Sequence, residues 1–240
     1  MAKLSPYVPS QNETNKLLSA TPKKELERLE GTVIDLPTRT MIYEPDQSID
    51  YVYFPRKGVI SAVKEFQNGD VIEVATIGKE GMVGIGVALG VPIPGNRVLA
   101  QVAGRAIRFE VEAFRRALPQ RPQLYHILLR YSHALLQQIA QCAACNRAHT
   151  VDERCARWLL MSHDRAGESS FILTQDFLAQ MLGVHRTTVS TAAGILQKAG
   201  MITYVRGRMT ILDREALESA ACECYQLILE QYEYAVGERP

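Results

Sequence analysis

The chain has 240 residues, of which 47% are hydrophobic and 22% are charged, and this balance is typical of one large or two ordinary folded domains. No apolar run approaches the roughly 18 residues of a membrane span, and the N-terminus lacks the apolar segment of a signal peptide. We therefore expect a cytoplasmic protein with no membrane partner. The net charge is only +1, so a basic surface requires local concentration of charge.

The first half of the chain predicts a short helix followed by a small antiparallel sheet. Leucines at helical spacing indicate a helix over 16–30. Short apolar runs separated by Pro, Gly and Asp then predict strands, and Asn68-Gly69 is typical of a hairpin turn. These runs cover 32–36, 51–54, 59–63, 71–76 and 98–102. Many short strands with close turns favour a compact barrel or roll.

A long helix is predicted to begin after Pro122, because apolar and small side chains recur there in steps of four and three. Such a heptad pattern is typical of a two-stranded coiled coil and favours a homodimer. Packing of the same residues against the chain's own sheet is the alternative. The predicted dimer seam consists of Leu124, Leu128, Tyr131, Leu135, Gln138, Cys142 and Cys145.

The stretch from 173 to 212 predicts two short helices joined by a turn at Gly183, followed by two strands around Arg206-Gly207-Arg208. A junction followed by an amphipathic helix, together covering 146–165, and a loop at 166–170 precede it. A helical pattern at 213–221, which we expect to continue through 222–234, follows it. Two helices joined by a short turn with a glycine form a helix-turn-helix, whose second helix enters the DNA major groove.

The second of these helices presents hydroxyl and basic groups, which bind phosphates and base edges. Between 173 and 212 four basic residues stand against Asp176 alone, a local charge of 4 − 1 = +3. Double-stranded DNA is therefore the predicted partner. The candidate DNA-binding residues are Thr174, His185, Arg186, Thr187, Thr188, Ser190, Thr191, Arg206 and Arg208.

The order of these elements resembles the Crp/Fnr family of bacterial transcription regulators. The most specific segments are CNRAHTVDERCARWLL at 145–160, LTQDFLAQMLGVHRTTVS at 173–190 and RGRMTILDREALE at 206–218. The resemblance implies an α+β fold with a cyclic-nucleotide-binding-like β-roll sensor over 1–120, a dimerisation helix over 121–149 and a winged helix-turn-helix over 150–240. It also implies a homodimer that contacts RNA polymerase and is not an enzyme.

Two positions of the recognition helix differ from the usual family pattern. The Arg-Glu-Thr-Val-Ser-Arg of the family is similar to the segment from Arg186 to Thr191, in which Thr187 and Thr191 replace the Glu and the second Arg. A threonine reproduces neither the carboxylate's contact with cytosine nor the bidentate contact of Arg with guanine. We therefore do not expect the usual family half-site.

The effector of such a sensor is not identified by the residues. In the region that resembles the cyclic-nucleotide clamp, Met82 stands where the family has Glu, and Val98 stands at the phosphate-binding Arg position. Arg97 lies one step away, which in a strand places it on the opposite face. Cyclic AMP in the usual mode is therefore not expected. The candidate effector-binding residues are Glu80, Gly81, Met82, Arg97, Val98 and Tyr131.

No metal site is predicted, because the five histidines are scattered without ligand spacing. Cys142-x-x-Cys145 with Cys155 superficially suggests an iron–sulfur ligand set, but we interpret these thiols as reduced and structural, with a redox role across a dimer as the alternative. The alternative function is a ligand-binding or redox-responsive signalling protein whose helix-turn-helix binds proteins. Common enzyme motifs such as the P-loop are absent from the sequence.

Overall fold

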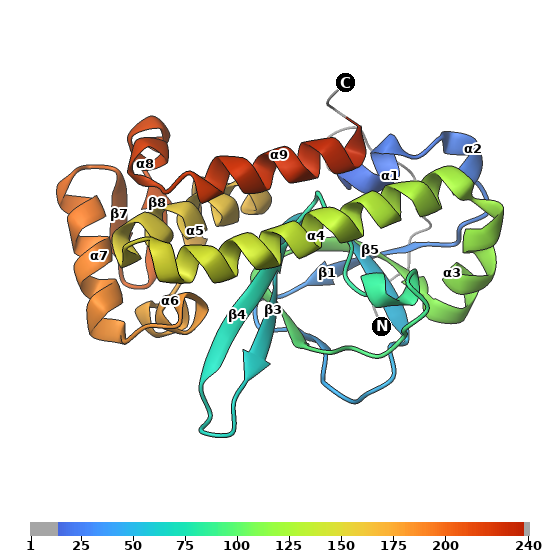
Figure 1. The fold of residues 1–240 in the computed structure, drawn as a ribbon, viewed down its shortest axis with the longest axis horizontal. Coiled ribbons are helices and arrows are strands. Elements are labelled where there is room, and N and C mark those ends of the chain that lie inside the picture. The colour runs from blue at the N-terminus through green and yellow to red at the C-terminus, as the bar shows by residue number, and fades with distance from the viewer. Residues whose placement is uncertain (1–13, 238–240) are drawn as a thin grey trace.

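The computed structural model describes residues 14–237. An N-terminal sheet lies beneath a long helix, and a three-stranded winged domain follows at one end (Figure 1). The elements of the N-terminal part are α1 (Lys16–Ala20), α2 (Lys23–Leu26), β1 (Thr32–Leu36), β2 (Met41–Tyr43), β3 (Tyr51–Glu65), β4 (Val71–Ile77), the 3-10 turn η1 (Ile85–Val87), β5 (Arg97–Glu110), α3 (Val111–Ala117) and η2 (Leu118–Gln120). Those that follow are α4 (Pro122–Ala148), α5 (Val151–Ala166), β6 (Ser170–Ile172), α6 (Gln175–Leu182), α7 (Arg186–Lys198), β7 (Ile202–Val205), β8 (Arg208–Ile211), α8 (Arg214–Ala220) and α9 (Cys224–Val236).

The N-terminal sheet is antiparallel, with the order β1-β5-β3-β4 and β2 paired to β5. Its two longest strands, β3 and β5, change register between Pro55 and Ile60, where bulges bend the sheet into a roll. Gly58 has φ +94° at this bend, and a Cβ on Gly104 would overlap the Lys57 carbonyl oxygen. The two glycines therefore allow the strands to approach where the roll turns.

The strand predictions at 51–54 and 59–63 were wrong in one respect, because both lie in the single strand β3. The bulges let one strand serve both halves of the roll, so the sequence pattern breaks although the strand does not. The helix predicted over 16–30 is divided into α1 and α2 by Thr21 and Pro22, whose backbones are extended. The short strands β2 and β6 were not predicted; β6 begins inside the loop expected at 166–170.

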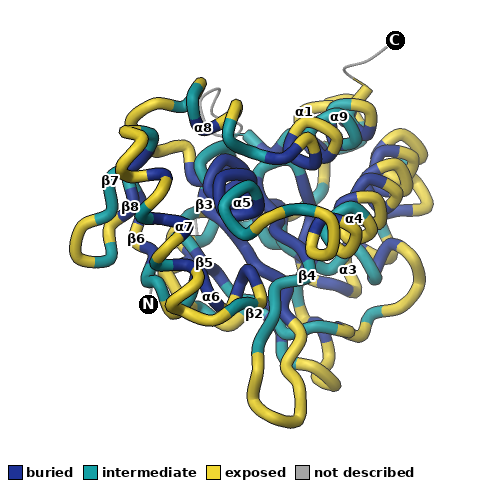
Figure 2. The backbone as a smooth tube through the Cα atoms, turned by 60° about the vertical axis from the view of Figure 1, so that its left-hand side comes forward, coloured by how far each residue is buried: buried dark blue, intermediate teal, exposed yellow. Residues whose placement is uncertain are grey.

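Helix α5 is the central element of the molecule (Figure 2). A capping box between Thr150 and Glu153 begins it, and Gly167 ends it with φ 68°. Residues 154–162 are all buried, because the helix contacts β3, β4 and β5 of the roll as well as α7, α8 and α9. The roll and the winged domain are therefore packed around a common helix.

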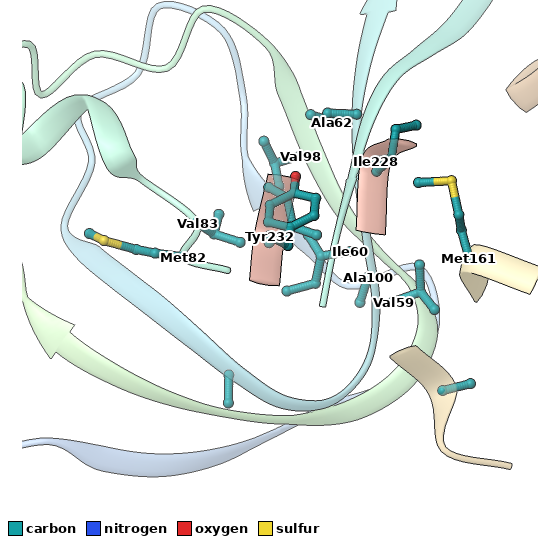
Figure 3. Packing of buried hydrophobic residues seen from close by; sticks show 14 of the residues in the cluster. Val59, Ile60, Ala62, Met82, Val83, Val98, Ala100, Met161, Ile228 and Tyr232 are labelled. Atoms are coloured by element: carbon teal, nitrogen blue, oxygen red, sulfur yellow. The ribbon is translucent and has the colours of Figure 1, made fainter. Parts of the chain in front are cut away.

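Helix α9 runs back along α4 in the opposite direction (Figure 1). The expected continuation of α8 into this helix was wrong, since Ala221 is extended and α9 begins separately at Cys224. Side chains of α9 join a core shared with the roll and α5. Figure 3 shows Tyr232 of α9 beside Ile60 and Val98 of the roll, with Ile228 on the side toward Met161 of α5.

The predicted dimer seam faces the chain's own core. Tyr131 packs its ring 6.1 Å from that of Tyr232, and Gln138 donates to the Thr76 carbonyl at 3.1 Å. Its buried members are Leu124, Leu128, Tyr131, Gln138 and Cys145, and its half-buried members are Leu135 and Cys142. These side chains are therefore not open to a second copy. The heptad spacing therefore reflects packing within one chain, the alternative that the pattern itself allowed.

Candidate nucleic-acid interface

Helices α6 and α7 form the predicted pair. The Thr174 hydroxyl accepts from the Phe177 amide at 3.2 Å and caps α6, and Gly183 ends that helix with φ 63°. Helix α7 then starts at Arg186 with His185 as its N-cap. Its buried side consists of Val189, Ala192, Ala193 and Leu196, as the apolar spacing predicted.

The opposite side of α7 is open. His185, Arg186, Thr187, Thr188 and Thr191 are exposed, so five of the predicted contact residues are open to solvent at the start of α7. Ser190 is half-buried and donates to Gln175 Oε1 at 2.7 Å, which ties the two helices together. Gln175 was not among the predicted residues, although its place just after the Thr174 cap puts it beside the first turns of α7.

The two predicted wing arginines lie at the tip of the hairpin between β7 and β8. Arg206 has φ 50° and Gly207 φ 76°, the pair of positive values that a tight type I′ turn requires. Both arginines are exposed. Arg208 lies 3.4 Å from the hydroxyl of Ser170 on β6, the strand that pairs with β8 and supports the hairpin. The predicted Thr174 differs from them, since its hydroxyl is occupied by the helix cap.

One acidic side chain lies within this basic surface. Asp176 Oδ1 is 3.3 Å from Arg186 Nη1, and both side chains are about two-thirds exposed, at 66% and 63%. An ion pair so exposed to water contributes little to stability. Arg186 is thus held in place only weakly and remains free to exchange Asp176 for another anion.

The candidate effector residues of the roll do not meet at one point. Glu80 pairs with Arg165 of α5 at 2.7 Å, whereas Arg97 pairs with Glu44 at 2.9 Å and Glu65 at 2.5 Å near the surface. These carboxylates hold the pKa of Arg97 above its ordinary value, and the hydrogen bond that Arg97 donates to Glu44 contributes most. Arg97 is therefore already engaged by two anions.

Other members of that set surround an apolar cavity. Met82 is fully buried and Val98 nearly so, and both line a cavity of about 190 Å³ that Leu135 and Ile139 of α4 close. None of its lining residues carries a charged side chain. Tyr131 donates to the Met82 carbonyl at 3.0 Å, and a Cβ on Gly81 would come within 2.6 Å of the Tyr131 hydroxyl. These two residues contact each other next to Met82 and do not line the cavity.

Glu80 and Arg165 belong to a buried polar network that joins the roll to three helices. Arg165 also lies 3.3 Å from Gln138 Oε1, to which Tyr232 donates at 2.9 Å. The network thus contains side chains of the roll, α4, α5 and α9. Its members are buried or nearly so, and no local sequence pattern predicts that they meet.

The chain is similar to known proteins at two levels. Residues 153–220 match the family model described as a Crp-like helix-turn-helix domain. This match covers α6, α7 and the wing and ends with α8. No curated protein matches the chain.

Among the helices of residues 14–237, none combines the length and apolarity needed to cross a membrane.

Solved structures of transcription regulators share the fold. FixK2 from Bradyrhizobium japonicum is 18% identical with a TM-score of 0.65, over 81% of this chain and 98% of that one. A Crp/Fnr-family transcriptional regulator from Eubacterium rectale is 15% identical with a TM-score of 0.65, over 85% and 96%. The c-di-GMP-responsive global regulator CLP of Xanthomonas campestris is 16% identical with a TM-score of 0.63, over 79% and 99%. At these identities the likeness establishes the fold, and it confirms the predicted order of roll, long helix and winged helix-turn-helix.

Proposed function

The C-terminal part of this chain is a Crp-like helix-turn-helix domain on the fold of the Crp/Fnr transcription regulators, and from that premise we propose a homodimeric, effector-controlled regulator that binds specific DNA sites. The observation that carries the proposal is the open side of α7, where Arg186 and three threonines are exposed in the same domain as the exposed wing arginines. Contact with RNA polymerase, which the resemblance implies, is part of the same proposal.

Arg186 is the side chain that we assign to base reading. It occupies the first turn of α7, the part of a recognition helix that reaches base edges in the major groove. A guanidinium binds guanine O6 and N7 in a bidentate manner. We assign Arg206 and Arg208, on the wing, to the phosphate backbone, where such contacts raise affinity without reading sequence.

The dimer interface that we propose is a second stripe of α4. Four apolar side chains of this helix stay exposed, and their exposed fractions are 37% for Tyr125, 40% for Leu129, 64% for Leu136 and 36% for Ile139. Together with Ser132 their spacing is 4, 3, 4 and 3 residues, the repeat of a two-stranded coiled coil. A second copy laid along this stripe would bury the exposed leucines.

The effector that fits the roll is apolar and uncharged. The cavity beside Met82 and Val98 contains no cation to pair with a phosphate, and burying an unpaired anion there would be costly. Ile139 belongs both to the cavity wall and to the exposed stripe of α4. Filling the cavity would therefore act directly on the proposed dimer helix. The c-di-GMP to which the Xanthomonas regulator responds does not suit a cavity of this chemistry.

Selection from random DNA followed by titration tests the function. We expect the full-length protein to enrich a roughly palindromic site whose affinity falls steeply with salt. Arg186→Ala should lower affinity for that site by about 10- to 100-fold while leaving binding to unrelated DNA nearly unchanged. Arg206→Ala and Arg208→Ala should weaken both kinds of DNA together. Failure to enrich any motif would contradict the proposal and favour a helix-turn-helix that binds protein.

A further inference from the structure

Three thiols and one imidazole meet where α4 ends. Cys145 lies in the last turn of α4, and His149 is the residue that caps this helix. Cys222 and Cys224 come from beyond the helix-turn-helix, on either side of Glu223 at the start of α9. The four ligand atoms all lie within 4.8 Å of one another. Two remote segments of the chain thus contribute two groups each to one cluster.

The separations within the cluster fit a tetrahedral metal ion. Zn²⁺ binds thiolate sulfur at about 2.3 Å and imidazole nitrogen at about 2.0 Å, so tetrahedral ligand atoms lie about 3.8 Å apart for two sulfurs and about 3.5 Å for sulfur and nitrogen. The Sγ atoms of Cys145 and Cys222 are 3.5 Å apart, and Cys224 Sγ is 3.6 Å from His149 Nδ1. A zinc ion therefore needs only small side-chain adjustments to bind all four groups.

Neighbouring side chains form hydrogen bonds with these groups and orient them, as the residues around metal ligands usually do. His149 Nε2 lies 3.0 Å from Glu223 Oε2, which directs Nδ1 toward the thiols. A metal-bound histidine usually donates its second ring nitrogen to such a carboxylate. Gln141 in turn donates from Nε2 to Cys224 Sγ at 3.0 Å, a bond that favours sulfur in its thiolate form.

Buried cations on α5 balance the charge of a loaded site. Three thiolates and one Zn²⁺ carry a net charge of −1. Arg154 and Arg157 are only 6% and 5% exposed, and both are close enough to Cys145 and Cys222 to interact with their charge. Neither forms an ion pair with a carboxylate within residues 14–237, and the Nε atom of each has no hydrogen-bond partner there. An anionic cluster would therefore stabilise these two buried guanidinium groups, of which Arg157 also interacts with the charge of Glu73.

Ordinary packing does not explain the cluster. Cys155 is a buried thiol of the main apolar core, where it acts as a small hydrophobic side chain. Cys145, Cys222 and Cys224 form a separate buried cluster that contains no other apolar residue. Cys142, one helical turn before Cys145, lies outside the cluster, and its sulfur is 3.6 Å from Arg157. The three thiols are thus grouped with one another rather than with the core.

We propose that Cys145, His149, Cys222 and Cys224 bind one structural Zn²⁺ that fastens the start of α9 to the end of α4. Four protein ligands fill the tetrahedral coordination, which is the property of a structural and not of a catalytic site. The site lies at the junction of α4 with α5. Metal binding therefore holds α9 against α4 and fixes the link between the roll and the winged domain.

The experiment measures metal in the full-length protein purified under reducing conditions without added metal. We expect about one zinc ion per chain by elemental analysis, as a filled structural site requires. Cys224→Ser and His149→Ala should each lose most of this zinc. Cys142→Ser is the matched control, because it removes a neighbouring thiol of the same helix, and it should retain the metal. Circular dichroism of each variant establishes that it is folded.

Cobalt exchange provides a measurement that does not depend on the variants. The wild-type chain stripped of zinc and reduced should bind one Co²⁺ with the thiolate charge-transfer and tetrahedral absorption bands of a sulfur-rich site. Hydrogen exchange in α9 should be faster without metal than with it. Absence of zinc together with absence of these bands would overturn the proposal. A disulfide between Cys145 and Cys222, or iron with inorganic sulfide in the native protein, would overturn it as well.

Discussion

Glu80 of the roll and Arg165 of α5 form an ion pair of 2.7 Å, with exposed fractions of 12% and 5%. Arg165 also donates to the Met161 carbonyl at 3.1 Å, so the guanidinium is held from both sides. Breaking a buried pair leaves an uncompensated charge, whereas removing both partners does not. This pair is thus one of the contacts that join α5 to the roll.

We expect Glu80→Gln and Arg165→Met each to lower the free energy of unfolding by about 3–5 kcal/mol. The double variant should lose clearly less than the sum of the two single losses, because neither charge is then left alone. Urea unfolding of the wild type, the two single variants and the double variant measures the four free energies of this double-mutant cycle. Additive losses would mean that the two side chains act independently and that the ion pair does not couple the domains.

The buried carboxyl of Glu73 makes stability depend on pH. Burial raises its pKa above the ordinary value, and the hydrogen bonds from Ser61 and Trp158 oppose this only in part. A group whose pKa is higher in the folded than in the unfolded chain contributes stability, and this contribution is fully present at pH values below the unfolded-state pKa. The contribution is lost as the pH rises through the folded-state pKa. Relative to wild type, Glu73→Gln should therefore become more stable from pH 4 upward, by about 1.4 kcal/mol per unit of pKa shift.

Thermal unfolding of both proteins at a series of pH values measures that difference. Glutamine can keep its oxygen as the acceptor for Trp158 Nε1, which lies 2.9 Å from the wild-type carboxylate, and donate from its nitrogen to Ser61 Oγ, which lies 2.6 Å from that carboxylate. The comparison therefore isolates the charge. A difference in stability that stays constant with pH would show that Glu73 titrates as it does in the unfolded chain.

Asp176 should weaken DNA binding through its charge. It stands 3.3 Å from Arg186 on the exposed surface, where it repels phosphates and competes for the guanidinium. Asp176→Asn should tighten binding to specific and to unrelated DNA alike, with the greatest gain at low salt. Glu112→Gln on α3, in the roll, is the matched control and should have no effect. Unchanged affinity in Asp176→Asn would exclude this acidic residue from the interface.

The sequence predicted the winged domain better than the sensor for a physical reason. In α6 and α7 the caps, the glycine turn and the apolar spacing all lie within a few residues, so local rules determine the structure. Val189 and Leu196 accordingly lie on the predicted buried face. The roll depends on bulges at Gly58 and Gly104 that join two apparent strands. Such long-range register is not visible in a local pattern.

The long helix shows why a correct pattern can suggest the wrong partner. The spacing of Leu124, Leu128 and Tyr131 predicts a buried stripe, and that stripe is buried. Periodicity does not say what covers it, and here the roll and α9 do. The cluster of Cys145 and His149 with Cys222 was not predicted for a related reason. Its two halves are separated in sequence by the whole helix-turn-helix.

The exposed stripe of α4 is the remaining surface to test. Leu136 is 64% exposed, and in a coiled coil its side chain would meet its counterpart on a second copy. Leu136→Glu should convert a dimer into monomers, because like charges would face each other across the seam while the isolated chain already leaves this position in water. Leu212→Glu, at a position 61% exposed near the wing, is the matched control. Sedimentation velocity should give a dimer for wild type and Leu212→Glu and a monomer for Leu136→Glu. A Leu136→Glu dimer would place the interface elsewhere.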